Sequence, residues 1–187
     1  MNGNQVTMAT HIALLRGVNV GGHKRIAMSD LRRFVTNLGF DDVRSLLQSG
    51  NLVFRGGSQS GLGLESLLER EAAKRLDLQT AFLVRTNREW QEVIAKNPFH
   101  DEAESDPSHL VVAFLKDTPR SSTVRLLKSA IEGPEIVRAQ GKQLYVVYPA
   151  GIARSKLTNK LIEGALDTRA TGRNWNTVLK LAALAEP

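Results

Sequence analysis

Residues 43–55, VRSLLQSGNLVFR, carry the clearest structural signal in the chain: they are two runs of strand-forming residues joined directly by Ser49-Gly50. A tight turn between two such runs predicts a β-hairpin. Apolar residues at helical spacing predict a helix on each side of it, the first between Ser29 and Gly39 and the second at 64–76. Strands are expected beyond them, at 11–16 and 80–85. The order βαββαβ predicts a ferredoxin-like unit, four antiparallel strands with two helices on one face.

The same order is predicted a second time after an acidic segment. The second set comprises a strand at 109–116, a helix at 121–131, a hairpin at 135–148, a helix at 157–166, a strand at 168–171 and a helix at 175–185. Trp90 and Trp175 each precede an apolar pair, and we interpret them as the same position in two copies. We therefore expect an α+β protein of two tandem ferredoxin-like halves, each followed by an extra helix. The alternative is one mixed sheet without duplication.

The expected organisation is a disordered leader at 1–10, a first half at 11–97, an acidic linker at 98–108 and a second half at 109–187. Strands such as 109–116 are apolar on both faces, which predicts that both faces of the sheet are covered. The extra helices or the other half would provide that cover. The side chains expected to be buried are Leu31, Phe34, Leu52, Phe54, Leu67, Trp90, Val111, Leu126, Val146, Leu161 and Trp175.

Composition excludes several function classes. The 187 residues contain no cysteine, so disulfides, thiolate zinc sites and cysteine nucleophiles are ruled out. No apolar run reaches the roughly 18 residues that span a bilayer, and we expect a cytoplasmic protein without a membrane partner, metal or cofactor. The net charge of +6 favours an anionic partner, either a small phosphorylated molecule or a nucleic acid. Aromatic residues make up only 5% of the chain, which disfavours a single-strand binder.

The basic loops of the second half are the principal candidate site. Residues 149–156 (PAGIARSK) and 171–174 (TGRN) each open a predicted helix and carry cations without a local acid. Free N–H groups at helix starts bind anions. We expect them to meet at one edge of the sheet and to bind a phosphate or carboxylate through Arg154, Ser155, Lys156, Arg173 and Asn174. The alternative is simple capping of the two helices by Ser155 and Asn174.

The glycine-rich loop of the first half is the second candidate. In a ferredoxin-like unit it meets the hairpin between strands two and three, and its glycines allow backbone N–H groups to approach an anion. The alternative is a loop that Asn19 and the glycines merely hold in shape. The residues of this second candidate edge are Arg16, Gly17, Asn19, Gly21, Gly22, Lys24, Ser49, Gly50 and Asn51.

No motif in the chain names a reaction. The loop at 17–24 lacks the ending of a P-loop, the four histidines are scattered, and no serine stands in a recognisable relation to a histidine and a carboxylate. Three functions remain open. They are a binding module for an anionic ligand, an enzyme acting on a small anionic substrate at the glycine-rich edge, and a protein–protein adaptor.

Several motifs resemble the bacterial family catalogued as domain of unknown function sixteen ninety-seven. They include LLRGVNVGG at 14–22, QSGNLVF at 48–54, GIARSKLTN at 151–159 and TGRNWNTVLKL at 171–181. The resemblance implies two ferredoxin-like halves and implies no activity, cofactor or catalytic residue. Ala153 stands where that family's segment is expected to have glycine, which makes this loop slightly stiffer.

Overall fold

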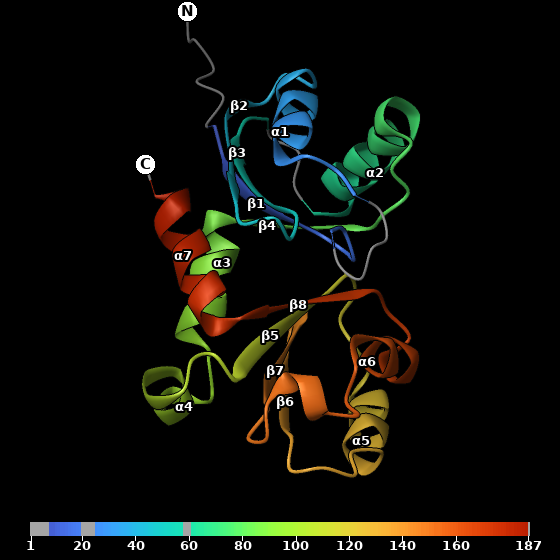
Figure 1. The fold of residues 1–187 in the computed structure, drawn as a ribbon, viewed down its shortest axis with the longest axis vertical. Helices are drawn as coiled ribbons and strands as arrows, with labels where there is room; N and C mark the ends of the chain where they lie inside the picture. The colour runs from blue at the N-terminus through green and yellow to red at the C-terminus, as the bar shows by residue number, and fades with distance from the viewer. Residues whose placement is uncertain (1–7, 20–24, 58–60, 187) are drawn as a thin grey trace, which may run out of the picture. The chain divides into compact units, whose positions relative to one another are not determined.

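The first ferredoxin-like half is a four-stranded antiparallel sheet with two helices on one face. The computed structural model describes residues 8–19, 25–57 and 61–186, so Gly21, Gly22 and Lys24 lie outside the described residues. The order of elements is β1 (Thr10–Leu15), α1 (Met28–Thr36), β2 (Asp41–Leu46), β3 (Asn51–Arg55), α2 (Leu62–Leu76) and β4 (Phe82–Thr86). The strands pair in the order β2-β3-β1-β4, and α1 and α2 lie on the same face (Figure 1).

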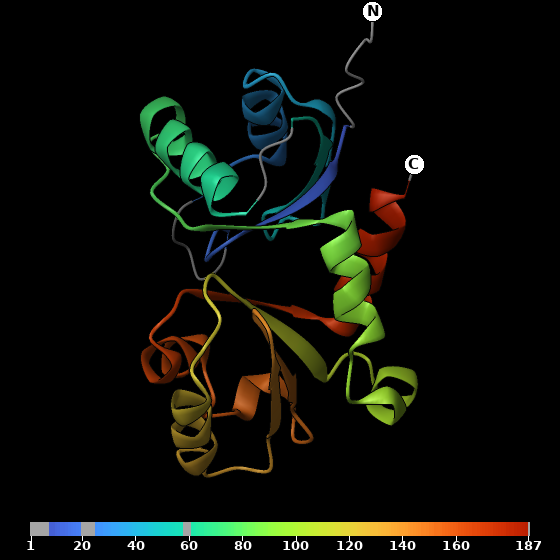
Figure 2. The same cartoon turned by 180° about the vertical axis from the view of Figure 1, so that it is seen from behind.

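The second half repeats this topology. Helices α3 (Asn87–Ala95) and α4 (His100–Ser105) precede it, so part of the expected acidic linker is helical. The half itself comprises β5 (Leu110–Leu115), α5 (Ser121–Ser129), β6 (Ile136–Gln140), β7 (Gln143–Val147), a 3-10 turn η1 (Ile152–Arg154), α6 (Asn159–Leu166) and β8 (Ala170–Asn174). The final helix is α7 (Trp175–Ala185). The strand order β6-β7-β5-β8 matches that of the first sheet, and the view from behind shows each of the fourth strands leading directly into a helix (Figure 2).

The additional helices are shared between two compact units. The first unit runs as far as Gln91 and includes the C-terminal residues from Leu181 onward, whereas the second comprises Glu92–Lys180. The division therefore falls inside α3 and inside α7. No helix in the described part of the chain is both long enough and apolar enough to cross a membrane.

The strand registers confirm the duplication but correct one of its expected markers. Leu52 pairs with Ala13 and Leu144 pairs with Ala113, so the two hairpins are equivalent as predicted. Arg85 and Arg173 occupy equivalent places in β4 and β8, opposite Ile12 and Val112 of the central strands. The helix that follows each strand begins two residues after this arginine. Trp90 is the fourth residue of its helix and Trp175 is the first, so the expected equivalence of the two tryptophans is wrong by three residues.

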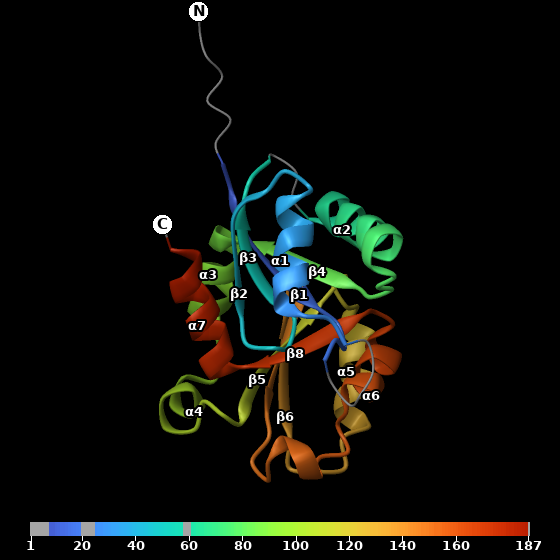
Figure 3. The same cartoon turned by 45° about the horizontal axis from the view of Figure 1, so that its top comes forward.

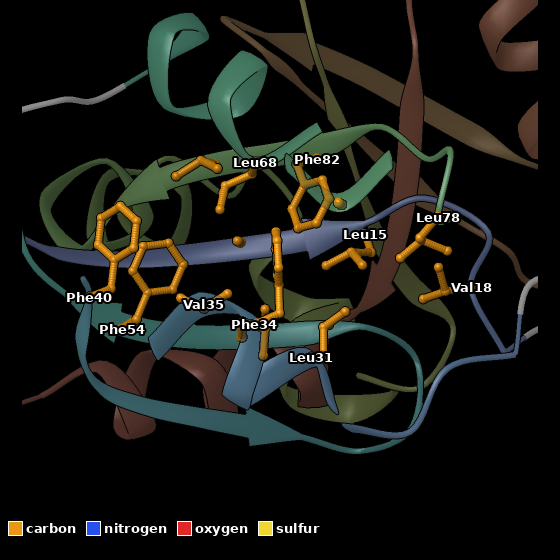
Figure 4. Packing of buried hydrophobic residues seen from close by; sticks show 14 of the residues in the cluster. Leu15, Val18, Leu31, Phe34, Val35, Phe40, Phe54, Leu68, Leu78 and Phe82 are labelled. Atoms are coloured by element: carbon orange, nitrogen blue, oxygen red, sulfur yellow. The ribbon is translucent and has the colours of Figure 1, made fainter. Parts of the chain in front are cut away.

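The core of the first unit lies between its sheet and its two helices. Leu31, Phe34 and Val35 of α1 pack against strand residues of the same cluster, including Phe54 and Phe82 (Figure 4). The apolar spacing of α1 places these side chains on one stripe, as predicted. An equivalent cluster in the second unit is built around Val111, Leu144, Val146 and Ile162.

Most of the expected core residues are buried, but the register of α5 is wrong by one residue. Leu126 is 66% exposed, and its neighbour Leu127 is fully buried in the core of the second unit. Two adjacent leucines of a helix cannot both face the same core, because they lie about 100° apart on the helix surface. Leu67 and Leu161 are partly buried. The other eight are 8% exposed or less.

The opposite face of each sheet is also covered, as the apolar strands predicted. Every residue of β5 is buried, and in the first sheet Ile12, Leu14 and Val53 are at most 1% exposed. On the second sheet, the hydroxyl of Tyr145 donates a hydrogen bond of 2.7 Å to the carbonyl of Val93, so the end of α3 lies over that face. Burial raises the pKa of Tyr145 to about 12.

Helix capping follows the sequence in α3 but not in α1. The amide of Thr86 donates to Glu89 Oε2 and the amide of Glu89 donates to Thr86 Oγ1, a capping box that the Thr86-x-x-Glu89 spacing alone indicates. Ser29, which would be a good capping residue before the predicted helix, does not cap α1: the helix begins at Met28, its N-cap residue is Ala27, and no side chain caps it.

A buried histidine makes the stability of the first unit pH-dependent. His11 is 0% exposed, its Nε2 donates to the carbonyl of Gly56 at 3.0 Å, and its Nδ1 has no hydrogen-bond partner among the described residues. Burial lowers the pKa of His11, against the raising effects of the Gly56 bond and Glu89. The folded state therefore resists protonation.

The contribution of His11 to the free energy of unfolding is expected to be constant above the unfolded pKa of about 6.5 and to fall as the pH drops below it. Its slope is at most about 1.4 kcal/mol per pH unit, the limit for one proton. Below the folded pKa of His11 this contribution levels off. Urea unfolding between pH 8 and pH 5 would measure it, with His11→Gln as a variant that keeps an N–H donor and does not titrate. Identical pH dependence of the two proteins would contradict this role.

Candidate functional site

Asn19 holds the glycine-rich loop of the first unit closed. Its backbone has a φ of 55°, its Oδ1 accepts from the amide of Ile26 at 2.9 Å, and its Nδ2 donates to the carbonyls of Ile26 and Gln48. Both amide hydrogens and the side-chain oxygen are thus used by backbone groups. The loop and the β2–β3 hairpin meet, as expected, and Asn19 performs the shape-holding role that was the alternative interpretation of this edge.

The β2–β3 turn is held in the same way. Asn51 is fully buried, and its Nδ2 donates to the carbonyl of Leu46 and to Ser49 Oγ. The carbonyl of Gly50 accepts from the amide of Leu15, which ties the turn to β1. The carbonyl of Arg16 likewise accepts from Thr80 Oγ1 at 2.6 Å. Gly17 has a φ of 64° and open space around it.

A groove lies beside this loop. It has a volume of about 560 Å³ and lies between α1 and the end of α2, which Figure 3 shows side by side over the first sheet. Residues at helical spacing on α1 form one wall, and residues 75–78 at the end of α2 form the other. A shallower hollow of about 480 Å³ adjoins it and shares Arg25, Ile26 and Ala27.

Three arginines line this groove, and they differ in their partners. Arg33 bonds Asp30 at 2.6 Å as an exposed pair, and the exposed Arg75 bonds the partly buried Glu71 at 2.9 Å; each pair lies within one helix. Such pairs contribute little to stability, so their guanidinium groups can exchange partners at low cost. Arg25 is exposed and makes no ion pair with the described residues.

Arg25 lies two residues before the uncapped start of α1. Ala27 provides no side-chain acceptor, so the start of this helix has no side-chain cap, and Ala27 itself lines the groove. Sequence reasoning missed Arg25, Arg33 and Arg75. The arginines of α1 are on the polar stripe, and nothing in the sequence indicates that the end of α2 lies opposite them.

The basic loop of the second unit carries acids that the sequence did not place there. Lys156 Nζ bonds Glu132 Oε2 at 2.8 Å, and Ser155 Oγ donates to Glu135. Glu132 raises the pKa of Lys156, and the same bond lowers the pKa of Glu132. The expectation of a basic edge without a local acid is therefore wrong. Arg154 is exposed at the end of η1.

Arg173 is buried inside β8 and does not reach that loop's surface. It is 8% exposed, and its Nη1 donates to Thr171 Oγ1 and to the carbonyl of Gly172, both at 2.8 Å. Burial lowers its pKa to about 10, so it stays protonated at neutral pH. The predicted loop at 171–174 is a strand, because its residues pair with β5 along their whole length.

Of the two helices that follow these loops, α7 is capped by the expected residue and α6 by an unexpected one. Asn174 Oδ1 accepts from the amide of Thr177 at the start of α7, as the capping alternative predicted. Helix α6 is capped by Thr158 rather than by Ser155, since Thr158 Oγ1 accepts from the amide of Leu161. The five residues of the principal candidate therefore have different surroundings. Ser155 and Lys156 bond to glutamates, Arg173 is buried and Asn174 caps α7. Of the five, Arg154 alone is an exposed cation without an ion pair among the described residues.

The described residues offer little acid–base or metal chemistry. Nowhere among them do three His, Asp or Glu side chains gather as metal ligands would. The buried carboxylate Glu65 lies 3.7 Å from Arg85 and accepts a bond from the amide of Val84, which is a structural arrangement.

The two antiparallel four-stranded sheets, each with two helices on one face, define a tandem ferredoxin-like α+β protein. The chain belongs to the family described as protein of unknown function DUF1697, whose model matches residues 8–145. A solved structure of the conserved bacterial protein SP0830 from Streptococcus pneumoniae is similar, with a TM-score of 0.75 and 22% identity. The match covers 96% of this chain and 99% of that one, and at this identity it shows a shared fold and nothing further. Among curated proteins, none matches this chain.

Proposed function

We propose that this protein binds a small phosphorylated or otherwise anionic ligand in the groove between α1 and the end of α2. The observation that carries the proposal is Arg25, an exposed cation without an ion pair among the described residues, which lines the groove beside an uncapped helix start. Oxyanions are favoured at such a start by the N–H groups and by the helix dipole.

Arg33 and Arg75 would complete the contact from the two walls. Their present partners, Asp30 and Glu71, are on the same helices at short sequence spacing, so an incoming phosphate competes only with surface ion pairs. An arginine can donate two parallel bonds to one phosphate, and it suits this task better than lysine. The net charge of +6 adds long-range attraction.

Thermal unfolding in a titration of inorganic phosphate and pyrophosphate tests the proposal. A ligand that binds only the folded state raises the unfolding free energy by about 2.7 kcal/mol when its concentration is 100 times Kd. Arg25→Gln is expected to weaken binding at least about tenfold, since a charge-assisted hydrogen bond contributes about 1.5–3 kcal/mol. The variant should unfold at the wild-type temperature without ligand, because Arg25 is exposed.

Arg154→Gln is the matched control, since it removes an exposed cation from the other candidate loop. It should leave the phosphate response unchanged. A response that persists in Arg25→Gln and disappears in Arg154→Gln would move the site to the second unit. Equal responses of all three proteins would show that phosphate acts through general charge, and the proposed site would be wrong.

A further inference from the structure

Side chains from the preceding helix block the outer edge of β4. Edge strands expose unpaired backbone groups that invite pairing with another chain, and proteins commonly protect them. Glu69 Oε1 accepts from the amide of Phe82 at 3.0 Å, and Glu65 Oε1 accepts from the amide of Val84 at 2.8 Å. Two successive outward N–H groups of this strand are thus already used.

Two other edges are protected as well. In β8, Glu163 Oε1 accepts from the amide of Ala170 at 2.8 Å and Asn159 Nδ2 donates to its carbonyl at 2.9 Å. Strand β2 is interrupted by a shift of register between Asp41 and Arg44, and Asp42 there has a φ of 49°. Bulges of this kind twist an edge away from partners.

The edge of β6 is regular, and no helix side chain covers it in the described structure. All five residues of β6 pair with β7, and a two-residue turn that starts at Gly141, with a φ of 58°, joins the two strands. In such a hairpin the residues beside the turn bond each other, so the amides of Val137 and Ala139 point outward. Val137 is only 2% exposed, and Arg138 donates a long bond of 3.3 Å to its carbonyl, so the open part of this edge lies at Ala139, which is exposed.

A groove of about 440 Å³ runs between this edge and α5. Val124 and Ala139 contribute apolar surface to it, and Arg125, Lys128 and Arg138 contribute positive charge. None of its lining residues is acidic or aromatic. Both β6 and α5 can be followed in Figure 3.

We propose that β6 accepts an extended acidic peptide of a partner protein as a fifth strand of the second sheet. Backbone bonds to Ala139, and to Val137 once Arg138 has turned from its carbonyl to a peptide carboxylate, would supply affinity in the strand-addition mode of peptide recognition. Carboxylates of the peptide would meet Arg125, Lys128 and Arg138, and five paired residues span about 17 Å. The positive charge of the groove favours an acidic peptide over other occupants.

The same groove disfavours two other occupants. A second copy pairing through its own β6 would bring the three cations of each copy together, and like charges in adjacent strands are destabilising. A single-stranded nucleic acid would find no aromatic ring on which to stack its bases.

A labelled heptapeptide of alternating glutamate and valine, followed by fluorescence anisotropy, tests the proposal on the full chain. Two further peptides carry N-methyl groups on alternate residues, in opposite phase. One of them should bind like the parent, and the other at least tenfold more weakly, because only one phase removes N–H groups that face β6. Equal binding of the two methylated peptides, or no binding of the parent, would overturn strand addition.

The charge contacts are tested by the double variant Arg125→Glu with Lys128→Glu. We expect at least tenfold weaker peptide binding, and Lys160→Glu, on the exposed surface of α6, should bind like the wild type. Equal affinity of all three proteins would overturn the proposal, and so would a labelled thymidine decamer that binds the groove in place of the peptide.

Discussion

Glu65→Ala is expected to lose about 3–5 kcal/mol of unfolding free energy, the cost typical of breaking a buried charge pair. Glu65 is 2% exposed, and its carboxylate serves the amide of Val84 and the guanidinium of Arg85, which is 6% exposed. Burial lowers the pKa of Arg85, and Glu65 opposes that shift. Without the carboxylate, a buried cation loses its counter-charge and an edge N–H loses its acceptor. Urea unfolding at neutral pH measures the difference.

Glu69→Ala is the matched control for this experiment. Glu69 accepts one edge N–H from Phe82 and is partly buried, so its loss should cost about 1 kcal/mol. Replacing both partners, by Glu65→Leu with Arg85→Met, should cost less than Glu65→Ala alone, since no charge is then left buried. If Glu65→Ala and Glu69→Ala are equally mild, the buried pair does not stabilise the fold.

Gly50→Ala is expected to cost about 2–5 kcal/mol, from backbone strain and overpacking together. Gly50 has a φ of 70°, and an added Cβ would lie 2.4 Å from Val18 Cγ2 and 2.8 Å from the Cβ of Leu15. Neither neighbour can move freely, because both side chains belong to the buried core of the first unit. The β2–β3 turn would have to shift away from β1. Thermal unfolding and urea titration both report this loss.

Gly17→Ala separates strain from crowding. Its φ of 64° is close to that of Gly50, but an added Cβ would meet no atom within 4 Å. The cost should therefore be only the left-handed backbone strain, about 1–2 kcal/mol. Similar losses for the two variants would show that the close packing at Gly50 contributes nothing.

The local features of the fold could be predicted from the sequence, because each depends on a few neighbouring residues. The hairpin at Gly141, the capping box of Thr86 and Glu89, and the doubly buried strand β5 all follow from turn chemistry or apolar periodicity. Their order along the chain then determined the βαββαβ topology of both halves. Alignment of Trp90 with Trp175 failed, since a short apolar pattern can match at the wrong helical position.

The candidate sites depended on residues distant in the sequence, and there the predictions from local charge were incomplete. The loop around Lys156 looks basic until Glu132, 24 residues earlier, is placed beside it. Arg173 looks like a surface cation until its strand pairs with β5 and buries it.

The two ferredoxin-like halves can be read from the sequence alone, because periodicity and turn residues act over a few neighbouring positions. Which cations remain exposed, which sheet edges are protected, and that the end of α2 forms a groove with Arg25 became visible only in the folded chain. Charge pairing and burial depend on distance in space, and tertiary packing brings together groups that lie far apart in the chain.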